Sequence, residues 1–219
     1  MFQKGFSGLI YKLSDWFLKI TYLNILWILF SLSGFIVLGI FPATIALFSV
    51  IHLLLTTEDE IPIFKTFWQH FKREFVKGNV SAWSITIIIV VMAGNIHFFK
   101  TTENHLFHFL YYPSIALTVI FVMSLLYFFP VYVQYNMNTF QNLKNSLLVM
   151  ISNPLNTLTM VSSVFVIGFV SLMITAILPF VSVSLTALFI MMAALQSFKR
   201  IEEKQSFYRI ITKNDNPDS

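Results

Sequence analysis

The chain has 219 residues, of which 57% are hydrophobic and 11% are charged, whereas soluble domains carry roughly 25% charged residues. A water-soluble domain of this length could not bury so much apolar surface, so the composition excludes one. The sequence has no cysteine, which excludes disulfides and Cys-ligated metal sites. Its formal net charge of +4 is spread between apolar stretches, and we expect a membrane rather than a nucleic acid as partner.

Long charge-free runs organise the sequence. They cover residues 20–57, 78–99, 104–143 and 145–198, and none shows the alternation of apolar and polar residues that is typical of a β-barrel. The pattern predicts an all-α membrane protein: residues 1–219 form a single transmembrane domain, a bundle of about six helices whose first partner is the lipid bilayer.

Residues 1–19 have apolar side chains at helical spacing, with polar ones largely between them. This pattern predicts an amphipathic helix in the membrane interface, with Trp16 and Lys19 at headgroup level. The alternative is a plain helical lead-in to the first span. A cleavable signal is not expected, because the stretch lacks a continuous apolar core and a small-residue cleavage site.

Residues 20–57 are too long for one crossing, since about 20 apolar residues span a lipid core about 30 Å thick. Gly39 relaxes the backbone and Pro42 interrupts helical hydrogen bonding near the middle of the run. We therefore expect a helical hairpin with its turn at Gly39–Pro42, the alternative being one tilted helix kinked at Pro42. Only about 21 Å of helix follows Pro42, so both a full crossing in a thinned bilayer and a re-entrant turn stay open.

Residues 58–79 predict a second amphipathic helix, in a cytoplasmic loop. Pro62 suits its first turn, aromatic side chains recur on one face, and basic side chains occupy much of the rest. Such a helix packs on a membrane surface or docks on a partner protein. The candidate docking residues are Phe64, Phe67, Trp68, Phe71, Lys72 and Arg73.

Residues 80–198 are expected to form four further spans, with an amide-rich polar connection before Asn153-Pro154 and a tight turn at Pro179. Residues 199–219 make a basic tail, and its last residues, 214–219, are expected to be disordered. The four spans cover about Val80–Phe99, Leu110–Val133, Leu155–Ala176 and Phe180–Phe198.

The distribution of Lys and Arg predicts the orientation. With six spans, all of the 14 except Lys100 fall on one side of the membrane. The positive-inside rule then places both termini in the cytoplasm. Five spans would separate the N-terminal charges from the rest, so charge supports the hairpin independently of length.

No P-loop, His-Glu-x-x-His, nucleophile elbow or GxGxxG motif is present, so we expect neither an enzyme nor a cofactor. The six spans contain no acidic or basic residue, unlike most proton- or ion-coupled transporters. A carrier site built from amides, hydroxyls and unwound backbone stays open. His97, His105 and His108 lie close together in sequence, but no second motif completes a metal site, so none is expected.

Polar residues inside the spans are expected to bond between helices. Asn24 and Trp27 share one helix face, and small residues spaced by four on the last span suit packing within the bundle or in a homo-oligomer. The candidate structural and hinge residues are Asn24, Trp27, Gly39, Pro42, Thr44 and Asn95.

Together, Asn24-x-x-Trp27, the segment Gly39-x-x-Pro42-Ala43-Thr44-x-Ala46 and the Phe64–Phe75 helix with Lys72 and Asn79 resemble the YesL-like bacterial membrane proteins, a family of unknown function. The resemblance is carried by about the first eighty residues, and no catalytic residues carry over with it. It implies the bacterial plasma membrane, and gene neighbourhoods that suggest an accessory role beside sugar ABC-transporter subunits.

The function expected from these observations is an accessory or assembly component for carbohydrate uptake. A small carrier or permease is the first alternative, and a membrane sensor acting through its cytoplasmic loops is the second. An enzyme acting on lipid-linked substrates is the least favoured, because no paired carboxylates or nucleophile stand at a membrane face.

Overall fold

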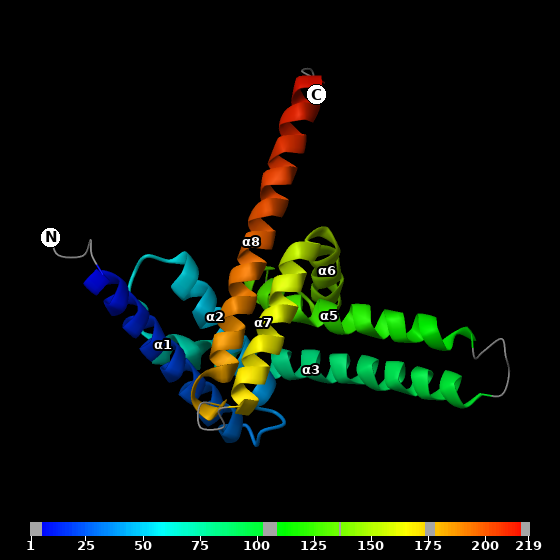
Figure 1. Cartoon of the computed structure of the whole chain (residues 1–219), viewed down its shortest axis with the longest axis horizontal. Helices are drawn as coiled ribbons and strands as arrows, with labels where there is room; N and C mark the ends of the chain where they lie inside the picture. Colours follow the sequence, from blue (N-terminus) through cyan, green and yellow to red (C-terminus); the bar gives the residue numbers. More distant parts are fainter. Residues whose placement is uncertain (1–5, 103–108, 136, 174–177, 216–219) are drawn as a thin grey trace. The chain divides into compact units, whose positions relative to one another are not determined.

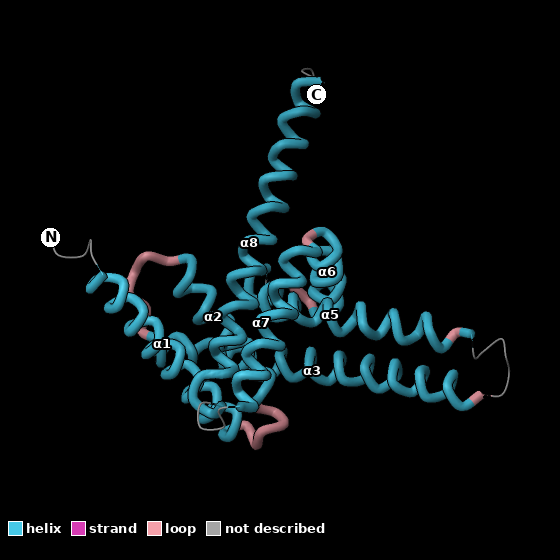
Figure 2. Tube along the Cα trace, viewed as in Figure 1, coloured by secondary structure: helices cyan, strands magenta, loops and turns pink. Residues whose placement is uncertain are grey.

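The structure is a computed structural model that describes residues 6–102, 109–135, 137–173 and 178–215. All regular elements in these ranges are helices, in the order shown in Figures 1 and 2. Two compact units are described separately below: Met1–Ile87 with Ser163–Phe189, and Ile88–Ser162 with Ile190–Ser219. The helices are α1 Phe6–Ser33, α2 Ile40–Thr56, α3 Ile63–Thr101, α5 Tyr111–Tyr135, α6 Thr139–Ser152, α7 Pro154–Met173 and α8 Leu178–Asp215.

In the first unit, α1 and α2 pack against each other as the predicted helical hairpin. The turn lies at residues 34–39, slightly ahead of the predicted Gly39–Pro42. Gly39 is the N-cap residue of α2, and Pro42 lies in the first turn of that helix, where its missing N–H would have had no helical partner. Pro42 therefore helps to start α2 and does not bend the chain. The helix α1 is continuous from Phe6, with no break near Lys19.

The amphipathic segment and the third predicted span are one continuous helix, the 39-residue α3. We expected one helix to end near residue 79 and another to begin, but α3 continues through this position. The sequence becomes less charged there, while its helical periodicity does not change. Gly78 lets α3 pass close to α2: a Cβ at this position would lie 3.0 Å from Cδ1 of Ile45.

In the second unit, α5 packs against α6. The sequence suggested only a polar connection where α6 forms. The many amide side chains in this segment made the buried face of the helix hard to recognise. Buried residues recur along that face at helical spacing: Asn142, Ser146, Val149 and Met150. The helix ends at Ser152, and Pro154 begins α7 after the C-cap residue Asn153. Since a residue before proline is driven away from helical geometry, the break falls at Asn153.

The last helix, α8, runs from Leu178 to Asp215 and takes in most of the predicted tail. Disorder was expected from residue 214, whereas Asn214 and Asp215 belong to the helix. Residues 216–219 lie outside the described ranges. The small-residue pair Ala193 and Ser197 is buried within the second unit, so it packs inside the chain's own bundle.

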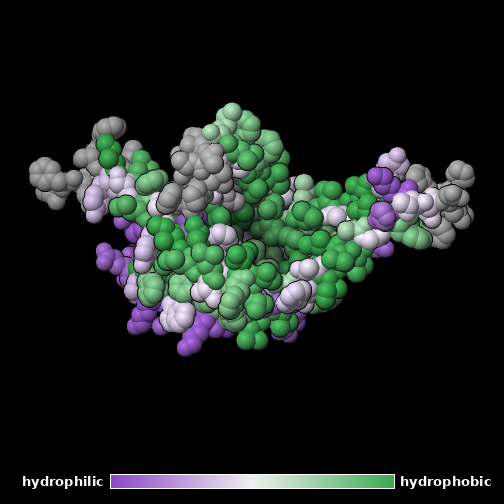
Figure 3. Space-filling view, turned by 90° about the horizontal axis from the view of Figure 1, so that it is seen from below, coloured by the Kyte–Doolittle hydropathy of each residue, from purple (hydrophilic) through white to green (hydrophobic). Residues whose placement is uncertain are grey.

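Five of the described helices are long and apolar enough to cross a membrane, by length and composition: α1 from Ile10, α3, α5, α7 and α8 over Val181–Glu203. The 17-residue α2 is a shorter apolar helix. Hydrophobic side chains cover much of the face seen in Figure 3, as lipid-facing helices require. The prediction of an all-α membrane protein is confirmed, and a full crossing by α2 stays a prediction.

Candidate functional site

The exposed polar surface of α3 in the first unit carries five side chains around an open hollow. We call this surface the basic face, and it is lined by Lys65, Trp68, Gln69, Lys72 and Arg73. The Lys72 ammonium nitrogen lies 5.9 Å from the centre of the Trp68 ring, within the range of a cation–π contact. The surface therefore presents three cations around one aromatic ring, an arrangement suited to an anionic partner group.

A cluster of aromatic rings holds the basic face in place. The ring of Phe30, near the end of α1, lies 5.2 Å from Phe67, 5.4 Å from Trp68 and 5.0 Å from Phe71, between ring centres. Aromatic pairs at these separations are mutually attractive beyond the area they bury. The amphipathic half of α3 is thus anchored on α1 and is not a loose loop.

The structure corrects the predicted docking stripe. Phe67 is 0% exposed and Phe71 is also buried, so neither ring is available to a partner. Phe64 is 54% exposed, Trp68 is 43% exposed, and Lys72 and Arg73 are exposed beside them. The aromatic spacing correctly indicated one helix face. That face packs against Phe30, and the basic side chains along its edge are exposed.

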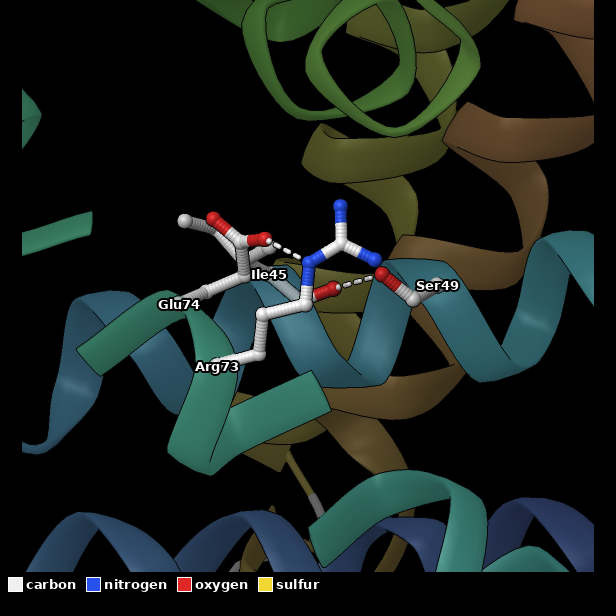
Figure 4. A network of polar contacts seen from close by, with 4 residues as sticks. All are labelled: Ile45, Ser49, Arg73 and Glu74. Carbon is white, nitrogen blue, oxygen red and sulfur yellow. Dashed lines mark hydrogen bonds and ion pairs between the residues drawn. The ribbon is translucent and has the colours of Figure 1, made fainter. Parts of the chain in front are cut away.

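A buried carboxylate under the basic face was not singled out from the sequence. The Arg73 Nε lies 3.1 Å from Glu74 Oε1, with side-chain exposures of 60% and 4%. Figure 4 shows this pair beside α2 at Ile45 and Ser49. An arginine beside a buried carboxylate offsets the cost of burying the charge. The adjacent positions of Arg73 and Glu74 in the sequence could have indicated an ion pair. The burial of Glu74 could not be predicted, because it depends on packing beside α2.

Three of the predicted structural residues, Asn24, Trp27 and Thr44, join helices in the first unit. The side-chain oxygen of Asn24 on α1 accepts hydrogen bonds from the Ser184 backbone N–H at 3.0 Å and hydroxyl at 3.2 Å. The Trp27 indole N–H donates to the Thr44 hydroxyl at 3.0 Å. These contacts tie α1 to α8 and to α2. Asn95, by contrast, is exposed on α3 rather than buried between helices.

A buried polar network in the second unit joins α5, α7 and α8. The Asn156 amide donates to the Ser197 hydroxyl at 2.8 Å. The Tyr127 hydroxyl lies 3.2 Å from that of Thr157 and 3.5 Å from that of Ser197. All four side chains are buried. Asn156 and Thr157 lie in the first turn of α7, just after the Asn153-Pro154 break, and that break was the sequence signal for this network.

Metal binding finds no support in the described ranges, where no group of three or more His, Asp or Glu side chains could hold an ion. His97 lies on α3, while His105 and His108 fall outside the described residues.

The apolar helices and the polar contacts between them define a helical membrane protein. A family described as "Protein of unknown function, DUF624" matches residues 20–96. No solved structure matches this chain. Three proteins of Bacillus subtilis (strain 168) are similar to it over most of their length. They are the uncharacterized proteins YteU, 32% identical over 84% of this chain and 83% of the relative, YesV, 29% identical over 84% and 88%, and YesL, 26% identical over 87% and 90%.

The chain therefore belongs to the YesL-like family of proteins of unknown function. The resemblance noted in the sequence extends well beyond the first eighty residues, since the similarity to each relative spans more than four fifths of the chain.

Proposed function

We propose that this chain is a non-catalytic accessory component of carbohydrate uptake in the bacterial plasma membrane, with both termini in the cytoplasm. On this proposal the basic face of α3 lies on the cytoplasmic side and contacts an acidic surface on a subunit of a sugar ABC transporter. The observation that carries the proposal is the exposed set of cations and Trp68 held on a fixed aromatic platform. A surface fixed in advance loses little conformational freedom on binding.

The carbohydrate part of the proposal rests on the gene neighbourhoods that the family resemblance implies. The orientation rests on the positive-inside rule. Charge complementarity supports an acidic partner, because exposed cations around one aromatic ring raise the rate and selectivity of such an encounter.

The test compares two double variants that each neutralise two exposed cations. Lys65→Gln/Lys72→Gln removes charge from the basic face, whereas Lys199→Gln/Arg200→Gln removes the same charge from α8. Each tagged protein is purified from its own membranes in mild detergent and its companions are identified by mass spectrometry, with sugar uptake measured in the same strains.

We expect transporter subunits with the wild-type chain and with the α8 variant, and their loss together with reduced uptake in the basic-face variant. The proposal fails if the wild-type chain brings down no transporter subunit, or if both variants behave like the wild type in binding and uptake.

A carrier is the second candidate, favoured by the buried polar network of Tyr127, Asn156, Thr157 and Ser197 next to the break between α6 and α7. Transporters commonly build substrate sites from buried polar groups at interrupted helices. Sugar flux into liposomes that contain only this chain would favour the carrier over the accessory component, and flux no greater than in empty liposomes would count against it.

A further inference from the structure

The amide of Asn95 lies on the apolar half of α3. Residues 78–99 of this helix carry no Lys, Arg, Asp or Glu and rise about 33 Å at 1.5 Å per residue, enough for the roughly 30 Å of a hydrocarbon core. Asn95 stands before Lys100 in the sequence, about 7.5 Å further into the layer. Its side chain therefore lies among acyl chains unless another protein group covers it.

The Asn95 side chain is without the partner that other amides of the spans have. Asn24 accepts from Ser184 and Asn156 donates to Ser197, in each case between two helices. Asn95 is exposed, and its side chain forms no hydrogen bond within the described residues. Polar side chains of membrane spans almost always face protein, where an amide can hydrogen-bond across helices. The position of Asn95 thus calls for a second protein surface.

The neighbouring residues suit this side of α3 to a closely packed helix. Four residues share the side at the spacing i, i+3, i+4 and i+7, and we call them the Asn95 face: Val91, Gly94, Asn95 and Phe98. Val91 is 57% exposed and Phe98 is 56% exposed. A Cβ on Gly94 would meet nothing within 4 Å, so the helix backbone is open there. Small residues at such positions let two membrane helices approach closely.

The helix that carries this face is the least buried of the five candidate spans in the described part of the chain. Only 6% of the most apolar window of α3 is buried, against 50% for α8. Lipid can cover the apolar side chains of such a helix, but acyl chains offer no hydrogen-bonding group to the Asn95 amide. A second protein helix supplies both kinds of contact.

A second copy of this chain has the chemistry that the Asn95 face requires. A carboxamide carries both a carbonyl acceptor and an NH₂ donor, so two Asn95 side chains related by a two-fold axis can donate to each other. Copies in one membrane share one orientation, which brings identical residues of α3 opposite one another. No charge on the face selects an oppositely charged partner. We infer that the chain forms a parallel homodimer through the Asn95 face.

The absence of cysteine lets single thiols report on this contact in the full-length chain. Val91→Cys and Phe98→Cys place a thiol on the Asn95 face, one before and one after the amide. Ile89→Cys is the matched control, because Ile89 is 42% exposed on the same helix but points about 160° away from Val91, at about 100° per residue. Two copies with different tags are expressed together, and their membranes are treated with a mild oxidant before purification through one tag.

We expect Val91→Cys and Phe98→Cys to give a disulfide-linked dimer that contains both tags and disappears on reduction. Ile89→Cys should stay monomeric, like the cysteine-free parent. The inference is overturned if neither face position gives the dimer, or if Ile89→Cys is linked to the same extent. A linked product that contains a protein other than this chain overturns it as well.

The amide itself is tested by energy transfer between copies fused to two different fluorescent proteins, in liposomes. Asn95→Val removes the hydrogen bond, whereas Thr86→Val removes an exposed hydroxyl that donates to the Ala82 carbonyl of its own helix. A hydrogen bond between membrane helices changes association by about tenfold, so Asn95→Val should weaken the dimer about tenfold and Thr86→Val should leave it unchanged. No transfer with the wild-type chain, or equal affinities for all three proteins, overturns the inference.

Discussion

Single glycines allow α1 and α2 in the first unit to approach each other closely at the turn between them. A Cβ on Gly39 would lie 2.3 Å from the Ser31 carbonyl oxygen, and one on Gly34 would lie 2.4 Å from the Gly39 Cα. The sequence pointed to Gly39 because glycine and proline stand together in an apolar run. It could not show that Gly39 is needed for close approach to α1, because that depends on the path of the turn.

Gly39→Ala is expected to destabilise the protein by about 1–3 kcal/mol, the usual cost of forcing extra atoms into a packed site. Gly94→Ala is the matched control, because a Cβ there meets nothing within 4 Å and alanine favours a helix. Thermal unfolding of both variants in the same detergent measures the difference. Equal melting temperatures would contradict the close approach described for Gly39.

The hydrogen bond from Trp27 to Thr44 is expected to contribute about 0.6 kcal/mol, with about 1.7 kcal/mol as the upper range for polar pairs between membrane helices. A double-mutant cycle of Trp27→Phe and Thr44→Val isolates this contribution from the effect of each substitution. Unfolding by a denaturing detergent gives the four stabilities. Strictly additive effects would show that the two side chains do not interact.

Among the elements, α3 differs most from its predicted form. Charge, aromatic spacing and Pro62 correctly indicated an amphipathic helix, yet they also suggested that it ends before the next span. The aromatic face was correctly placed on one side of the helix, but whether it meets a partner or the chain itself was not determined by spacing. Phe30, the ring that settles the question, belongs to another helix and carries no local signal.

Phe67→Ala is expected to destabilise the protein by about 3–5 kcal/mol, since a fully buried aromatic ring is replaced by a cavity. Phe64→Ala removes the same ring from a position that is 54% exposed and should cost clearly less. Thermal unfolding and elution as a single species compare the two. If both variants unfolded and eluted like the wild type, the described packing on Phe30 would be wrong.

For the whole molecule, composition and the long charge-free runs together were sufficient to predict an all-α membrane protein. Most spans followed from charge-free runs, because a lipid core demands uninterrupted apolar helices. The helix α6 and the extension of α8 were missed, since both lie where polar residues make the pattern ambiguous. The network of Tyr127, Asn156, Thr157 and Ser197 joins residues up to 70 positions apart, a distance over which periodicity carries no information.

Ser197→Ala is expected to destabilise the second unit by about 1–3 kcal/mol, because the Asn156 amide loses a buried partner. Ser162→Ala removes a hydroxyl that is bonded only to the Leu158 carbonyl of its own helix, and it should change stability by less. Unfolding in detergent gives both values. A smaller effect at position 197 than at position 162 would show that the network does not hold α7 and α8 together.

The bond between Asn24 and Ser184 joins two residues 160 positions apart in the chain. A ribosome delivers α1 to the membrane early and α8 last, so Ser184 has not yet been made when Asn24 enters the lipid. The first unit can close only after the final helix has been translated. Chains that stop before α8 would retain an amide in lipid without this partner, which gives cellular quality control a chemical difference between unfinished and finished copies.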